Sequence, residues 1–76
     1  MDIKIIGTGC DKCRKLYENT LEAVKITGVD ATITKVEDLL SIVKLGVMAT
    51  PALMIDGKIA CTGRVKKTEE IIRWIK

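Results

Sequence analysis

Three cysteines, Cys10, Cys13 and Cys61, are the side chains best suited to reactive chemistry in this chain of 76 residues. The chain has no histidine, which removes the Ser-His and Cys-His arrangements of hydrolases and the zinc sites that use imidazole. Two residues separate Cys10 from Cys13, and this CxxC spacing lets two sulfurs form a disulfide or bind one metal ion together. The spacing therefore indicates either thiol–disulfide exchange or the binding of a soft metal.

The position of the CxxC motif favours the exchange reaction. A short Ile-rich run at residues 2–6 predicts a buried strand, and apolar residues at helical spacing predict a helix over residues 11–26. Cys10 then lies just before the helix, where free backbone amides and the helix dipole stabilise a thiolate. Lys12 adds positive charge, so we expect the pKa of Cys10 to lie below the ordinary value of a cysteine thiol. Cys10 is thus the expected nucleophile, and Cys13, one helical turn further on and turned toward the protein, is the expected resolving thiol.

Other roles for the cysteine pair stay open at this point. A purely structural disulfide is a weak explanation, because closing so short a loop stabilises by under about 2 kcal/mol in the chain-entropy model. A soft-metal chaperone would bind Cu(I) through the thiolates of Cys10 and Cys13. Such chaperones finish with a strand and usually carry Met two residues before the first Cys, whereas this chain has Thr8 there. A redox-silent adaptor would make both cysteines dispensable.

Three further segments are expected to be strands. Residues 30–36 alternate apolar and β-branched polar side chains, a pattern typical of a strand. Residues 52–55 and 58–61 are joined by Asp56-Gly57, and both turn residues tolerate positive φ. This pair of segments therefore predicts a β-hairpin.

Two shorter helices complete the expected order. One follows the acidic pair Glu37-Asp38 and ends at Gly46. Its apolar residues are expected to face inward, namely Leu39, Leu40, Ile42 and Val43. The other is capped by Thr68 and ends the chain over residues 69–76. The order strand, helix, strand, helix, strand, strand, helix predicts the α/β class, with parallel first strands, an antiparallel hairpin and three helices over a mixed four-stranded sheet.

Cys61, the third cysteine, is expected to be a packing residue. In a regular strand, alternation places Cys61 on the same face as Ile59. Cys61 is therefore expected to be a buried and inert small hydrophobic residue. A redox role as a third thiol near the CxxC pair is the alternative.

The segment Thr50-Pro51 lies just before the hairpin, and the expected topology brings it beside the end of the first strand. Together with the CxxC motif and with Gly63 after the last strand, it resembles the thioredoxin superfamily, and in particular the small glutaredoxin-like redox proteins of archaea and bacteria. The resemblance covers nearly the whole chain and implies a minimal thioredoxin fold. It implies Cys10 as nucleophile, Cys13 as resolving thiol and Pro51 as a cis-proline packed against them. It also implies that the backbone of Thr50 pairs with an extended substrate segment.

The chain also departs from the family pattern. Gly9, in the loop that the resemblance places beside the nucleophile, stands where typical thioredoxins have tryptophan before the first cysteine. Their buried aspartate falls at about Lys4 here, so Asp11 or solvent would have to accept the proton of the resolving thiol. Of the Gly-Gly-x-Asp-Asp segment with which glutaredoxins bind glutathione, only Gly63 is retained.

Composition and net charge limit which partners and which cellular location we expect for this chain. With 47% hydrophobic residues, residues 1–76 are expected to form one domain. An odd number of cysteines and the lack of an apolar leader or membrane span favour a cytoplasmic protein without a membrane partner. The net charge of +3 is spread along the chain, which argues against binding nucleic acid. We expect a monomer without metal or cofactor other than a Cys10–Cys13 disulfide, acting on protein disulfides and recharged by an unidentified reductase.

Overall fold

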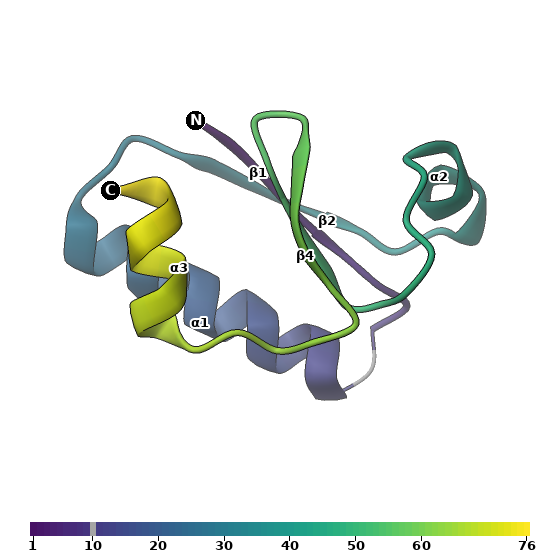
Figure 1. The fold of residues 1–76 in the computed structure, drawn as a ribbon, viewed down its shortest axis with the longest axis horizontal. Coiled ribbons are helices and arrows are strands. Elements are labelled where there is room, and N and C mark those ends of the chain that lie inside the picture. Colours follow the sequence, from purple (N-terminus) through teal and green to yellow (C-terminus); the bar gives the residue numbers. More distant parts are fainter. Residues whose placement is uncertain (10) are drawn as a thin grey trace.

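The structure is a computed structural model that describes residues 1–9 and 11–76. Within these residues the chain forms β1 (Asp2–Ile6), α1 (Asp11–Thr27), β2 (Thr32–Val36), α2 (Leu39–Lys44), β3 (Ala52–Ile55), β4 (Lys58–Thr62) and α3 (Thr68–Ile75) (Figure 1). The strands form one sheet in the order β2-β1-β3-β4. Strand β1 is parallel to β2 and antiparallel to β3, which is antiparallel to β4. The expected α/β class, element order and mixed sheet of a minimal thioredoxin fold are confirmed.

One face of the sheet packs against α1 and α3, which lie side by side (Figure 1). The apolar residues of β1 that face this side are Ile3 and Ile5, as the strand alternation requires. The buried core here consists of Ile3, Ile5, Leu16, Ala23, Leu53, Ile71 and Ile75. Thr20 of α1 is also fully buried, and its hydroxyl donates to the Leu16 carbonyl at 2.8 Å, which satisfies its polar group. This core sets the position of α1, and with it the position of Cys13.

The opposite face of the sheet packs against α2. Its smaller cluster consists of Ile6, Ile42, Val47, Ala52 and Met54. Asp38 caps α2, since its carboxylate accepts a hydrogen bond from the backbone N–H of Ser41 at 2.9 Å. Val47 and Ala52 lie on either side of the Thr50-Pro51 segment, so this cluster holds that segment against the sheet.

The expectation that four apolar residues of α2 face inward is wrong. Ile42 is buried at 4% exposure, whereas Leu39, Leu40 and Val43 are 69%, 65% and 64% exposed. A helix as short as Leu39–Lys44 makes fewer than two turns, so it can press only one side-chain row onto the sheet. Ile42 occupies that row.

The strand pair β3–β4 contains a register shift that corrects the interpretation of Cys61. Leu53 pairs with Cys61 but Met54 pairs with Ile59, so Ala60 is an extra residue in β4. Leu53 and Met54 point to opposite faces of the sheet, and their partners do the same. Cys61 therefore faces the α1/α3 side, half-buried, while Ile59 is exposed on the other.

The ends of the elements follow local signals with small differences. The hairpin turns at Asp56 and Gly57, both at positive φ (49° and 83°). Strand β2 begins at Thr32, two residues later than expected. Thr68 is the first residue of α3 rather than its cap; Lys67 occupies the cap position without a side-chain hydrogen bond. Among the described residues, no helix is long and apolar enough to cross a bilayer.

Candidate active site

Cys13 lies in the first turn of α1 and is buried, as expected, at 6% exposure. Its sulfur packs against the backbone of Gly7, the residue that follows β1: a Cβ added at Gly7 would overlap Cys13 Sγ and would lie 3.3 Å from Cys13 Cβ. Gly7 is itself buried, and its N–H donates to the carbonyl of Val36 at 2.9 Å, which continues the pairing of β1 with β2. Cys10, the expected nucleophile, lies outside the described residues.

The start of β3 also reaches this point. The Thr50–Pro51 peptide bond is cis, as the resemblance implied, and Pro51 is fully buried. A Cβ at Gly7 would lie 3.8 Å from Pro51 Cα. The carbonyl of Pro51 in turn accepts a hydrogen bond from the N–H of Gly63 at 2.8 Å. The start of β3, which is distant in sequence, therefore meets the end of β1 and the first turn of α1 at Gly7.

Residue 63 is another position at which a side chain would be unfavourable. It adopts φ +70°, a conformation that L-residues rarely take, and a Cβ there would lie 3.4 Å from Ala49 Cβ. Its hydrogen bond to Pro51 ties the end of β4 to the start of β3. Gly63 thus helps to hold Pro51 in place through this hydrogen bond.

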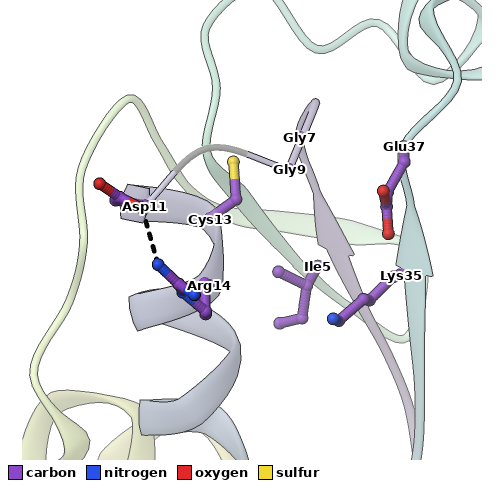
Figure 2. A pocket seen from close by; sticks show the side chains of 8 residues that line it. All are labelled: Ile5, Gly7, Gly9, Asp11, Cys13, Arg14, Lys35 and Glu37. Atoms are coloured by element: carbon purple, nitrogen blue, oxygen red, sulfur yellow. Dashed lines mark hydrogen bonds and ion pairs between the residues drawn. The ribbon is translucent and has the colours of Figure 1, made fainter.

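A pocket of about 400 Å³ opens beside Cys13, between the ends of β1 and β2 and the start of α1 (Figure 2). Its lining consists of Ile5, Gly7, Gly9, Asp11, Cys13, Arg14, Lys35 and Glu37. Asp11 and Arg14 form an exposed ion pair at 2.7 Å across one turn of α1. The ammonium group of Lys35 lies over the Tyr17 ring, 4.2 Å from its centre. The pocket therefore holds two carboxylates and two cationic groups close to a buried thiol.

Lys4 occupies the sequence position at which typical thioredoxins have a buried aspartate. Alternation along β1 turns Lys4 to the face opposite Ile5, where its ammonium pairs with Asp2 at 2.9 Å. The carboxylates in the pocket lining belong to Asp11 and Glu37, and that of Asp11 is exposed and paired with Arg14.

Cys61 is a separate, half-buried thiol. It packs against the α1/α3 core, and its Sγ is 4.0 Å from the carbonyl of Arg64, to which it donates. Burial raises the pKa of the Cys61 thiol; its contact with the Leu53 backbone and the charge of Lys66 oppose that rise. Cys61 does not line the pocket described above. Within residues 1–9 and 11–76, no group of three or more potential metal ligands converges.

The structure brings together some of the residues singled out from the sequence and separates others. Cys13 and Pro51 both lie beside Gly7, Pro51 is hydrogen-bonded to Gly63, and Gly9 lines the pocket at φ +87°. Thr50 is exposed beside Pro51, and Lys12 is exposed on α1 outside the pocket lining.

Sequence reasoning missed Lys35 and Glu37 as site residues, and it included Gly7 only as part of the loop beside the nucleophile. The parallel register of β1 and β2 offers a signal for two of them. Because Ile6 pairs with Val36, the residues that follow the two strands, Gly7 and Glu37, must lie next to each other. The contact of Gly7 with the Cys13 sulfur leaves no trace in a single sequence.

A strand–loop–helix junction that carries a CxxC motif, beside a buried cis-proline in a βαβαββα fold, defines the class of thioredoxin-like proteins. A family model described as a thioredoxin domain matches residues 1–76. A thioredoxin of Methanothermobacter thermautotrophicus is 44% identical over 71 residues, which cover 93% of this chain and 92% of that protein. A thioredoxin of Methanocaldococcus jannaschii is 42% identical over 74 residues, covering 97% and 85%. The chain belongs to the thioredoxin family, a family of thiol–disulfide oxidoreductases.

Proposed function

We propose that this chain exchanges a Cys10–Cys13 dithiol with disulfides of other proteins, with Cys10 as the attacking thiolate and Cys13 as the resolving thiol. The observation that carries the proposal is the placement of Cys13. Its sulfur is buried at the first turn of α1, against Gly7 and next to Pro51. A cysteine at that place can reach a neighbour three residues earlier, but it is shielded from bulky protein substrates.

The reaction divides into two exchange steps. In the first, the Cys10 thiolate attacks one sulfur of the substrate disulfide, so that a Cys10–substrate disulfide forms and the other substrate sulfur leaves as a thiolate. In the second, Cys13 gives up its proton and attacks Cys10; the Cys10–Cys13 disulfide forms and the remaining substrate sulfur leaves as a thiolate. The substrate disulfide is reduced by two electrons and the chain is oxidised by two. The pocket beside Cys13 gives its proton a path to solvent past Asp11 and Glu37.

Substrate and reductase are proposed by class. Thr50 is exposed beside Pro51, and we assign its backbone to pairing with an extended segment of the substrate protein. A separate reductase, of the thioredoxin-reductase type or of another type, returns the chain to the dithiol form. The working unit is a cytoplasmic monomer of one domain that uses the Cys10–Cys13 disulfide in place of a cofactor.

The test is reduction of insulin and of a small dithiol reporter by the reduced protein. Cys10→Ser is expected to abolish turnover. Cys13→Ser is expected to carry out the first step alone and to accumulate mixed disulfides with partner proteins. Cys61→Ser is the matched control, because Cys61 lies outside the pocket, and it should retain the wild-type rate.

Two outcomes would contradict the proposal. Mixed disulfides that accumulate with Cys10→Ser instead of Cys13→Ser would reverse the two roles. A stoichiometric Cu(I) complex together with no turnover would assign the same two thiolates to a soft-metal chaperone.

A further inference from the structure

Gly7 differs from every other glycine of the chain in its backbone conformation. Gly9, Gly28, Gly46, Gly57 and Gly63 have φ values between 69° and 87°, which explains why glycine stands at each of them. Gly7 lies outside that left-handed region, so its backbone conformation does not require glycine. Another reason must account for the missing side chain.

That reason is the Cys13 sulfur. An alanine Cβ at residue 7 would overlap Cys13 Sγ and would lie 3.3 Å from Cys13 Cβ, which is a tight contact, whereas Pro51 Cα would be at an ordinary contact distance of 3.8 Å. The backbone of Gly7 cannot readily shift away from the sulfur, because Gly7 is buried and its N–H donates a hydrogen bond to the carbonyl of Val36. The Cys13 sulfur thus occupies the volume that a side chain at residue 7 would need.

We propose that Gly7 is a positioning residue for the resolving thiol: the space left by its missing Cβ holds the Cys13 sulfur in place for attack on the Cys10 mixed disulfide. A methyl group there must displace the sulfur or the backbone. Effective intramolecular attack depends on alignment, and displacements near 1 Å can cost about a hundredfold in rate. The kinetic part of this inference rests on the proposed function, but the steric part does not.

The steric part is tested by a double-mutant cycle in unfolding, with the protein kept reduced. The four proteins are wild type, Gly7→Ala, Cys13→Ala and the double variant. In the wild-type background, Gly7→Ala is expected to lower the folding equilibrium constant about tenfold or more, as overpacking does. In the Cys13→Ala background the sulfur is gone and only the tight approach to the Cβ of residue 13 remains. The same change should then cost much less than in the wild-type background, and the restriction of the unfolded chain by alanine offsets part of that cost.

An equal loss in both backgrounds would overturn the proposal, since the cost would then be independent of the sulfur. If Gly7→Ala alone does not fold, the double variant decides: folding restored by Cys13→Ala supports the contact, and failure of both variants refutes it. None of these outcomes depends on redox activity.

The kinetic part is tested by following both exchange steps with Gly7→Ala. The first step, attack by Cys10, should keep its rate, while release of the substrate from the mixed disulfide should slow at least tenfold. Equal slowing of both steps, or of neither, would refute the positioning role. If wild type itself performs no exchange, the proposed function fails, and the unfolding cycle still decides whether the sulfur requires glycine at residue 7.

Discussion

Two adjacent residues of α2 provide a matched test of how this helix holds the proline segment. Ile42 is 4% exposed and packs with Val47 and Ala52, which flank Thr50-Pro51, whereas Val43 is 64% exposed. Ile42→Ala removes three buried carbon groups, worth about 2.4 kcal/mol at about 0.8 kcal/mol each. The cavity left behind raises the expected loss to about 3–4 kcal/mol.

Val43→Ala removes two carbon groups that are mostly in water already. The expected loss of burial is roughly 0.5 kcal/mol, and the higher helix propensity of alanine offsets an amount of similar size. Val43→Ala should therefore leave the free energy of unfolding nearly unchanged. The two substitutions lie on the same short helix, so any general effect on α2 is common to both.

Urea unfolding followed by circular dichroism measures the difference. With a slope near 1 kcal/mol per molar, which is typical of small domains, Ile42→Ala should lower the midpoint by about 3 M and Val43→Ala by less than about 0.5 M. Similar losses for the two variants would show that α2 buries both side chains, and the assignment of Ile42 as its one inward residue would then be incorrect. A loss for Val43→Ala alone would show that the side of the helix that carries Val43, and not the side that carries Ile42, lies against the sheet.

Two further predictions concern pH. The pKa of Asp38 is lowered by its hydrogen bonds from Ser41, so this carboxylate contributes stability above its unfolded pKa and loses that contribution as the pH falls through its folded pKa. Asp38→Ala should therefore be less stable than wild type at pH 7, and the difference should narrow in strong acid; a difference that stays constant down to pH 2 would contradict the capping role. Burial raises the pKa of Cys61, so in the Cys10→Ser/Cys13→Ser background its alkylation by iodoacetamide should have a pH midpoint above that of the same protein in denaturant, and an equal or lower midpoint would contradict it.

Much of the architecture could be predicted because its signals are local. The Asp56-Gly57 turn and the periodicity of residues 11–26 each depend on neighbours a few residues away, and the structure contains the hairpin and the helix that they predict. The order of elements then limits the sheet to few topologies, because parallel neighbours need a right-handed crossover. The placement of Cys13 followed from this reasoning.

The errors in α2 and β4 have different physical causes. Helix periodicity says which side chains share a face, but the amount of surface that a neighbour covers decides which faces are buried. In α2, one row contacts the sheet, so Leu39 and Leu40 stay exposed. In β4, the extra residue Ala60 shifts the alternation, and it separates Cys61 from Ile59.

The sequence alone was enough to define the CxxC motif, its place between the first strand and the first helix, and the α/β order around it, because residue type and short-range spacing determine these features. The contacts that shape the site were decided only by the tertiary structure. Strand pairing between distant segments brings Glu37 and Pro51 beside Gly7, and the Cys13 sulfur occupies the space that a side chain at Gly7 would need. A sequence does not show why a position needs glycine. The reason is visible only in the folded protein, where another atom occupies the space that a side chain would need.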